Sequence, residues 1–370
     1  MSRADAADDG GLAARLRDAD LGALTVPLGI VAIAVLLRPV VSHPLLLGYA
    51  QIANSMLIWM LVVASFNILL GYTGLLSFGH AMFLGIGTYS VAIGVAKLDV
   101  AFLLAAPLGI LLATAIAYLV ARMIVQKGEI YFAMLTMAFA KSVHFIANYD
   151  PGGLTGGTTG IAGGALPGWI ETVRGFKYVV VAGWQLDWYY AIAIVFTVAM
   201  LLMWQLVRSP FGRTLVAIRE NQKLARAMGI DVRRYKVWAF TFSAAFAALA
   251  GVLLEVNDQG ATLSALSIPT SGDVILMSVL GGANYFFGPL AGAFVWLFAE
   301  DYLTEFHTLA LPLSEYPLVT FEVSGLLTYW QFLLGLLFVI AVLVSPREGI
   351  WGLLRNGLGS LYGRLRGDAE

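Results

Sequence analysis

Long apolar runs separated by short polar segments dominate the hydropathy pattern of this chain. Each run approaches the roughly 20 residues that an α-helix needs to cross about 30 Å of hydrocarbon. The predicted spans are Leu24–Val41, Leu45–Leu70, Phe78–Ala96, Ala101–Val125, Ile130–Ala147, Trp188–Val207, Val237–Val256, Leu290–Leu303 and Tyr329–Val344. The runs lack the short alternating pattern of barrel strands. We therefore expect an all-α polytopic membrane protein with about eight to ten transmembrane helices.

Composition supports this class. The chain of 370 residues is 59% hydrophobic and 12% charged, with a mean hydropathy of +0.82. This leaves too little polar surface for a soluble protein, so lipid must cover much of it. The absence of cysteine excludes disulfides, thiolate metal sites and cysteine nucleophiles. Residues 1–23 are polar and Asp-rich, which predicts a cytoplasmic tail and not a cleaved signal.

Lys and Arg are concentrated in a few places, and this predicts an orientation. Basic residues gather in 122–127, in 208–236 and in the C-terminal tail 347–370. The positive-inside rule places all three on the cytoplasmic side, and counting spans back places the N-terminus there too. The transmembrane domain would then cover 24–346, with a long external loop at 148–187. Lys177 in that loop runs against the rule, which long loops obey poorly.

Two apolar segments are too rich in glycine to form uninterrupted helices: Gly71–His80 and Leu280–Pro289. Each glycine costs up to about 1 kcal/mol relative to alanine in a helix. Broken backbone persists at membrane depth only inside protein or along a water-filled cavity, and paired breaks in transporters indicate the translocation pathway. The alternative is close helix packing through small residues. The candidate pathway residues are Thr73, Ser77, His80, Tyr89 and Asn284.

Single polar residues within the spans have ordinary interpretations as well. His80 is more simply a buried histidine bonded to a backbone carbonyl, and Asn67 could bridge helices. Deep ionisable groups are few, which argues against a proton- or sodium-driven carrier. No His-Glu-x-x-His, no Gly-x-Ser-x-Gly and no clustered carboxylates in the spans are visible, so we expect neither an enzyme nor a metal site.

The most informative polar segment is 208–236. It holds eight Lys or Arg against Glu220 and Asp231. Ser209-Pro210 is a helix-start signal and Gly229 a helix-stop signal, so we predict one helix over Pro210–Met228. Its defined ends and helical periodicity favour a docking surface. The alternative is a basic loop that only sets topology and touches anionic lipid.

Five segments in order resemble the LivM-type permeases, the membrane subunits of branched-chain amino acid ABC importers. The resemblance covers about 57–352. Its segments are Gly71-Tyr-Thr-Gly-Leu-Leu-Ser-Phe-Gly-His, Tyr131-Phe-Ala-Met-Leu-Thr-Met-Ala-Phe-Ala, Thr155-Gly-Gly-Thr-Thr-Gly-Ile, Ser209-Pro-Phe-Gly-Arg-Thr-Leu-Val-Ala-Ile-Arg-Glu-Asn and Val279-Leu-Gly-Gly-Ala-Asn-Tyr-Phe-Phe-Gly-Pro-Leu-Ala-Gly-Ala. The fourth, continued by Ala227-Met-Gly-Ile-Asp, is the most specific.

The resemblance implies a set of partners and a role for segment 208–236. The partners are two cytoplasmic ATPases, a second similar permease subunit, a periplasmic or extracellular solute-binding protein and the lipid of the bacterial inner membrane. No nucleic acid is expected. This chain needs no cofactor, because ATP and Mg would be bound by the ATPases; it has no Gly-Lys pair for a P-loop. The predicted helix would couple to an ATPase through Arg213, Arg219 and Glu220, with Gly212 and Gly229 setting its geometry.

The chain departs from this family at two places. Asn284-Tyr-Phe-Phe is bulkier than the usual stretch, and the segment from Glu300-Asp301 to Thr328 is longer and more acidic. Both could bear on the solute. The family also carries urea and short-chain amides, so such a permease is one alternative, and an ion-coupled carrier or channel is another. Neither the solute nor the like or unlike nature of the permease pair follows from the sequence.

Overall fold

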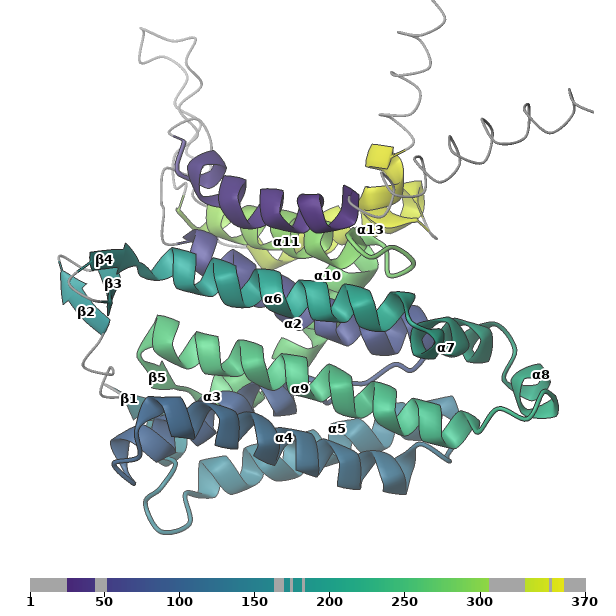
Figure 1. The fold of residues 1–370 in the computed structure, drawn as a ribbon, viewed down its shortest axis with the longest axis horizontal. Helices are drawn as coiled ribbons and strands as arrows, with labels where there is room; N and C mark the ends of the chain where they lie inside the picture. Colours follow the sequence, from purple (N-terminus) through teal and green to yellow (C-terminus); the bar gives the residue numbers. More distant parts are fainter. Residues whose placement is uncertain are drawn as a thin grey trace, which may run out of the picture.

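The helices form a bundle whose two ends differ (Figure 1). This computed structural model describes residues 25–43, 52–162, 170–173, 176–181, 184–305, 330–345 and 348–355. A small sheet, β2 (Ile170–Val173), β3 (Phe176–Val181) and β4 (Trp184–Asp187), lies at one end, here called the hairpin end. The short helices α7 (Pro210–Glu220) and α8 (Gln222–Ala227) lie at the other, here called the α7 end.

The described chain is predominantly helical, which confirms the predicted class. Five helices are long and apolar enough to cross a membrane: α2 (Ile52–Thr73), α4 (Phe102–Ile124), α5 (Glu129–Tyr149), α6 (Trp188–Arg208) and α9 (Val232–Asp258). Shorter apolar helices are Thr25–Val41, α3 (Ala81–Ala96), α10 (Ile268–Gly281) and α13 (Trp330–Val344), and α11 (Gly288–Glu305) follows α10. The predicted tail 1–23 lies outside the described residues, as does most of 347–370.

Helices α2 and α9 form the centre of the bundle. In their most apolar windows 78% and 72% of the residues are buried, against 28% to 33% in α4, α5 and α6. α9 packs against α2, α3 and α4. Apolar side chains on the outside of α4, α5 and α6 are exposed, and the described residues leave them uncovered. In a membrane such surfaces face lipid or another protein.

The first glycine-rich segment interrupts a span as predicted. α2 ends at Thr73, residues 74–80 belong to no helix, and α3 starts at Ala81. Gly74 has φ +72°, a conformation that favours glycine, and its Cα faces the side chain of Arg219 in α7. α3 then contacts the two short strands β1 (Ile161–Ala162) and β5 (Gly260–Ala261). Segment 74–80 and α3 together cross the bundle.

A second interruption lies between α9 and α11, where the sequence located only part of it. After α9 the chain forms β5 (Gly260–Ala261), which pairs with β1 (Ile161–Ala162), then the 3₁₀ turn η2 (Leu263–Leu266) and α10. The predicted break near 280–289 is confirmed as loop 282–287. The helix before it was not predicted. Its signal was Ser267 ahead of Ile268-Pro269, because Ser267 caps α10 by accepting from the Thr270 amide at 3.3 Å.

The predicted external loop folds into strands tied to the helices. β2, β3 and β4 form an antiparallel sheet. From β3, Lys177 Nζ donates to the Val256 carbonyl at 2.7 Å and to that of Asn257, so it satisfies carbonyls at the end of α9. Burial lowers the pKa of Lys177. Arg38 pairs with Asp187 at 2.6 Å. Lys177, the cation that runs against the positive-inside rule, therefore connects β3 to the end of α9.

Candidate functional site

Helix α7 begins as its sequence predicted. The Ser209 hydroxyl accepts from the Gly212 amide at 3.4 Å, and Pro210 occupies the first turn. Gly212 lies against the end of α6: a Cβ at this position would stand 2.1 Å from the Val207 carbonyl oxygen. No side chain fits there, so glycine sets the angle between α6 and α7. Leu215 is buried against the bundle.

The prediction of one continuous helix over Pro210–Met228 is wrong. The backbone breaks at Asn221, where φ is −155° and ψ is 95°. The Asn221 side chain then accepts from the Leu224 amide at 2.9 Å and caps α8. Asparagine favours such caps over helix interiors, and this preference explains the break. The predicted stop is confirmed, because Gly229 has φ +82° just after α8.

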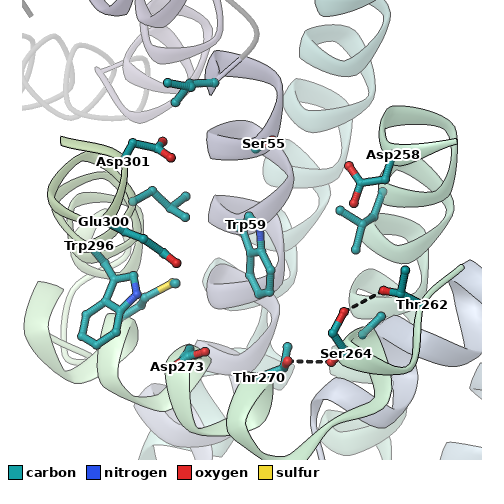
Figure 2. A pocket seen from close by; sticks show the side chains of 15 residues that line it. Ser55, Trp59, Asp258, Thr262, Ser264, Thr270, Asp273, Trp296, Glu300 and Asp301 are labelled. Carbon is teal, nitrogen blue, oxygen red and sulfur yellow. Dashed lines mark hydrogen bonds between the residues drawn. The ribbon is translucent and has the colours of Figure 1, made fainter. Parts of the chain in front are cut away.

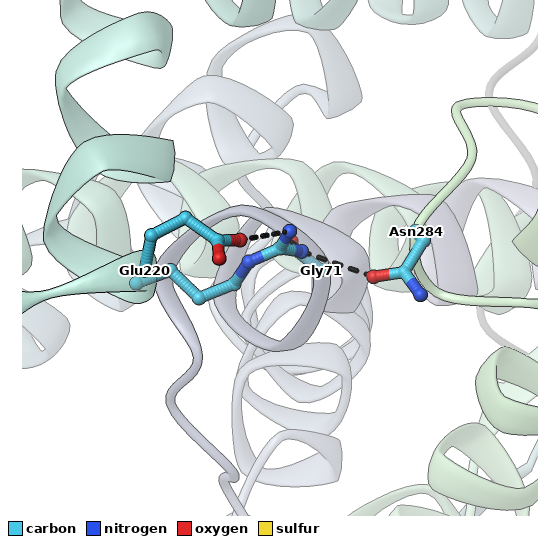
Figure 3. Close-up of polar contacts among 4 residues, drawn as sticks. Gly71, Glu220 and Asn284 are labelled. Atoms are coloured by element: carbon cyan, nitrogen blue, oxygen red, sulfur yellow. Dashed lines mark hydrogen bonds and ion pairs between the residues drawn. The ribbon is translucent and has the colours of Figure 1, made fainter. Parts of the chain in front are cut away.

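Arg219 links α7 to both glycine-rich segments (Figure 3). Its guanidinium donates to the Gly71 carbonyl at the end of α2 and to Asn284 Oδ1 at 3.1 Å, in loop 282–287. It also pairs with Glu220 at 2.9 Å. The Arg219 side chain is 27% exposed, so these bonds form partly out of water. A single side chain on α7 therefore holds two breaks that lie more than 200 residues apart in the sequence.

The two glycine-rich segments also touch each other. A Cβ on Gly71 would stand 2.2 Å from the Ala283 carbonyl oxygen, so α2 and loop 282–287 approach as only glycine allows. We expected Asn67 to bridge two helices; instead its Nδ2 donates to the Tyr285 carbonyl at 3.3 Å and joins α2 to loop 282–287. The breaks are thus one connected structure at the α7 end.

The starts of α3 and α10 meet inside the bundle. The Ala81 amide donates to Ser271 Oγ at 3.0 Å, and the Phe78 amide donates to Thr136 Oγ1 at 3.2 Å. Both hydroxyls are buried and supply partners that the broken backbone would otherwise lack. Protein hydroxyls therefore satisfy these two backbone amides where α3 begins.

The predicted pathway residues divide between these places. Thr73, Ser77, His80 and Tyr89 are all buried, with exposures of 5% or less, and none lines a described cavity; Asn284 lies at the Arg219 junction. His80 Nε2 is 2.9 Å from Ser65 Oγ, so its described partner is a hydroxyl and not the backbone carbonyl we expected. A pathway role for these residues stays a prediction.

The predicted ATPase-coupling residues also take different positions. Arg213 and Glu220 are exposed on α7, whereas the Arg219 side chain points into the bundle and donates to the Gly71 carbonyl. Gly212 and Gly229 lie at the two ends of the α7–α8 segment. Contact of any of them with an ATPase stays a prediction.

A cavity of about 360 Å³ opens at the hairpin end between α2, η2, α9, α10 and α11 (Figure 2). Carboxylates reach it from three helices: Asp258, Asp273, Glu300 and Asp301. Trp59 and Trp296 supply aromatic walls, and Thr262, Ser264 and Thr270 supply hydroxyls. None of the described residues that line it is Lys or Arg. We call it the acidic cavity; it suits a small solute that carries positive charge or hydrogen-bond donors.

Sequence reasoning missed most of this cavity. Glu300 and Asp301 were noticed as unusual, but Asp273 was not, because its helix was not recognised. The cap and proline signal at Ser267–Pro269 would have revealed that helix. The grouping of the four carboxylates depends on tertiary packing, and spacing along the chain does not disclose it.

Two interrupted spans meet at the capped helix α7, and an acidic cavity lies at the opposite, hairpin end. Together these features are typical of a membrane transport protein. The family described as the branched-chain amino acid transport system / permease component matches residues 48–342. The chain therefore belongs to this family.

The chain is similar to permeases named for branched-chain amino acid transport and for ribose import. It is similar to the high-affinity branched-chain amino acid transport permease LivM of Escherichia coli K12, at 26% identity over 70% of this chain and 64% of that protein. LivM of Salmonella typhimurium is 24% identical over 87% of this chain and 74% of that protein. The ribose import permease RbsC of Bacillus subtilis is 36% identical over 25% and 29%. No solved structure matches the chain.

Proposed function

We propose that the chain is the membrane-spanning permease subunit of an ATP-binding cassette importer. The observation that carries this proposal is the Arg219 junction, in which α7 holds Gly71 and Asn284 together. A secondary carrier needs no such surface helix. An importer driven from outside the membrane needs a rigid element that receives force and is bonded to the moving segments.

The mechanism follows from these contacts. Closure of the ATPase pair on ATP pushes α7, and the Arg219 bonds transmit the displacement to the end of α2 and to loop 282–287. Because the contacts of α7 must differ between the two states, ATP binding shifts the balance between a cavity open at the hairpin end and one open at the α7 end. ATP and Mg belong to the ATPases.

The orientation and the partners form part of the same proposal. The α7 end faces the cytoplasm, in line with the basic residues of 208–236, and both termini are cytoplasmic. Two ATPases dock at α7 and α8. A second, similar permease subunit completes the pathway, and a solute-binding protein delivers solute at the hairpin end. The chain lies in the inner membrane of a bacterium.

The solute we propose is a branched-chain or related amino acid. The named specificity of the LivM relatives supports this choice. The acidic cavity accommodates such a solute, because carboxylates such as Asp273 accept hydrogen bonds from an ammonium group and Trp59 covers an apolar side chain. A zwitterionic amino acid is net neutral and its own carboxylate gains nothing from acidic side chains, so the preference over urea and short amides rests on the relatives.

Reconstitution tests the class and the solute. The chain would be co-expressed with an ATPase pair and a second permease, placed in proteoliposomes, and supplied with binding protein and radiolabelled leucine or urea. Uptake that requires internal ATP and favours leucine is the expected result. Uptake by this chain alone, driven by an ion gradient, contradicts the proposal, and preference for urea contradicts only its choice of solute.

A further inference from the structure

A second polar cavity, of about 380 Å³, lies at the α7 end and shares no lining residue with the Arg219 junction. It is formed by the turn between α4 and α5, by α8 and by the start of α9. Arg226, Arg233 and Lys236 bring three positive charges to it, and Asp231 brings one negative charge. Asp231 is engaged as the cap of α9, where it accepts from the Arg234 amide at 3.1 Å. The cavity therefore carries an excess of positive charge.

These cations are held by neutral groups of the chain. The ion pairs between described residues are Arg38–Asp187 and Arg219–Glu220, and neither involves the cavity. Arg233 donates to the Arg122 carbonyl at 3.2 Å, and the side-chain amide of Gln126 lies against its guanidinium. Neutral acceptors orient a guanidinium but leave its charge uncompensated.

Lys236 is the most buried of the three cations. It is only 6% exposed, and Nζ donates to Gln222 Oε1 at 3.0 Å. Glu129, at the start of α5, interacts with it electrostatically but does not line the cavity. Removing an ammonium group from water is costly unless an anion comes with it. The cavity thus has an ammonium, two guanidinium groups and two side-chain amides, with the carboxylate of Asp231 engaged as a helix cap, around a space that an anion can fill.

The surroundings place this cavity at the level of lipid headgroups. Farther along α4 and α9 toward the middle of the bundle, Tyr118 and Trp238 have ring centroids 5.7 Å apart, and the Arg122 guanidinium lies 5.8 Å from the Tyr118 ring. Such Trp, Tyr and Arg groups are typical of the membrane–water interface. Beside it, Met123 and Ile130 are 66% and 77% exposed on the outside of α4 and α5. A lipid can therefore reach the cavity from the bilayer.

We propose that this cavity binds the phosphate of an anionic phospholipid headgroup, whose acyl chains lie along α4 and α5. Guanidinium groups bond two phosphate oxygens at once, and a lysine adds a point charge. Basic pockets between transmembrane helices at the inner surface are known to hold such headgroups. Since α8 and α9 both line the cavity, the bound lipid would fix the base of the α7–α8 segment against α4 and α5.

Native mass spectrometry of the purified chain tests this proposal. The protein is released from micelles that contain equal amounts of phosphatidylglycerol and phosphatidylcholine. The variant is Arg226→Gln with Arg233→Gln, and the matched control is Lys223→Gln with Arg234→Gln, which removes two exposed cations from the same helices but none from the cavity. We expect one retained phosphatidylglycerol per wild-type or control chain, and about ten-fold less retention in the variant.

Several results would overturn the proposal. They are equal losses in the two double variants, equal retention of the two lipids, or displacement of phosphatidylglycerol by millimolar inorganic phosphate, which would indicate a site for free phosphate. Loss of the lipid when the ATPases bind would instead assign the cavity to a protein interface. If the double variant does not fold, Arg226→Gln alone serves, because Arg226 is exposed on α8 and should still lower retention several-fold.

Discussion

The two ends of the bundle use charged side chains in different ways. At the hairpin end, carboxylates from three helices surround a cavity of about 360 Å³. At the α7 end, Arg219 fills the space between α2, α7 and loop 282–287 and bonds to each of them. Polar groups surround open space in the acidic cavity and fill the space between segments at the Arg219 junction.

This difference indicates how the work of transport is divided. A cavity with aromatic walls and acceptor groups can bind a solute, but its contacts give no way to receive force. A junction in which one guanidinium fixes three segments can transmit displacement, because its hydrogen bonds are charge-assisted and partly shielded from water. Substitutions at the two ends should therefore affect different kinetic quantities.

Arg219→Gln should have the largest effect. It removes a charged donor from the Gly71 carbonyl and from Asn284, and each charge-assisted hydrogen bond is worth about 1.5–3 kcal/mol. We expect ATP-driven uptake in the complete importer to fall roughly ten- to a hundred-fold at every solute concentration, while the KM for solute changes little. Arg234→Gln removes an exposed cation at the start of α9, outside α7 and α8, and is the control. Equal loss in both variants would mean that Arg219 acts only through the positive charge of the α7 end.

Asp273→Asn should have the second largest effect, of the opposite kind. The change keeps the shape of the side chain and removes one charge from the acidic cavity. For an amino acid we expect KM to rise about ten-fold with little change in maximal ATP hydrolysis. Asp99→Asn alters an exposed carboxylate between α3 and α4 that does not line the cavity, and it should leave KM unchanged. A fall in maximal rate without a change in KM would remove the cavity from the solute-binding role.

Gly229→Val should have a smaller effect, confined to the α7 end. Gly229 has φ +82° and no atom within 4 Å of an added Cβ, so the cost is backbone strain of about 1–2 kcal/mol and not a clash. Uptake should fall a few-fold while the protein still inserts. Gly229→Asn, which tolerates the left-handed region, should retain most activity. If both variants transport normally, the end of α8 does not control coupling.

Local signals in the sequence identified the α7 end better than the hairpin end. Ser209, Pro210 and Gly229 act on the backbone within a few residues, so they predict where the helical segment starts and stops. The break at Asn221 was just as local and was overlooked, because the apolar periodicity continues across it. The two glycine-rich breaks were also found from composition alone.

Contacts between distant residues could not be read in this way. Arg219 was expected to face a partner, yet its described bonds go to residues 148 and 65 positions away. Asp273 meets Glu300 and Asp258 in one cavity only because α10 packs beside α11 and the end of α9 lines the same cavity. The strands of β2–β4 are short, and their pairing with each other depends on the turn geometry between them. Sequence periodicity reports burial, but it does not report which buried faces meet.

The smallest effect we predict lies at the hairpin end and depends on pH. Asp150, at φ 53° after α5, accepts from the Thr155 amide at 2.6 Å and the Thr155 hydroxyl at 2.9 Å, and these bonds hold its pKa below the ordinary value. A carboxylate with a lowered pKa stabilises the fold above its unfolded pKa, and that stabilisation is lost as the pH falls through the folded value.

Asp150→Asn tolerates the same backbone conformation but cannot ionise. We expect a lower melting temperature at pH 7, by at most about 2 °C, and a difference that shrinks as the pH falls below about 4, where the carboxyl is protonated first in the unfolded chain and, at lower pH, in the folded protein. Tryptophan fluorescence of the detergent-solubilised protein measures both. Asp99→Asn, at another left-handed position with φ 53°, should show no such pH-dependent difference, because its carboxylate accepts no hydrogen bond from the described residues. A difference for Asp150→Asn that persists unchanged at low pH would mean that the Thr155 bonds act through shape alone, and that the charge of Asp150 contributes nothing to holding the hairpin end together.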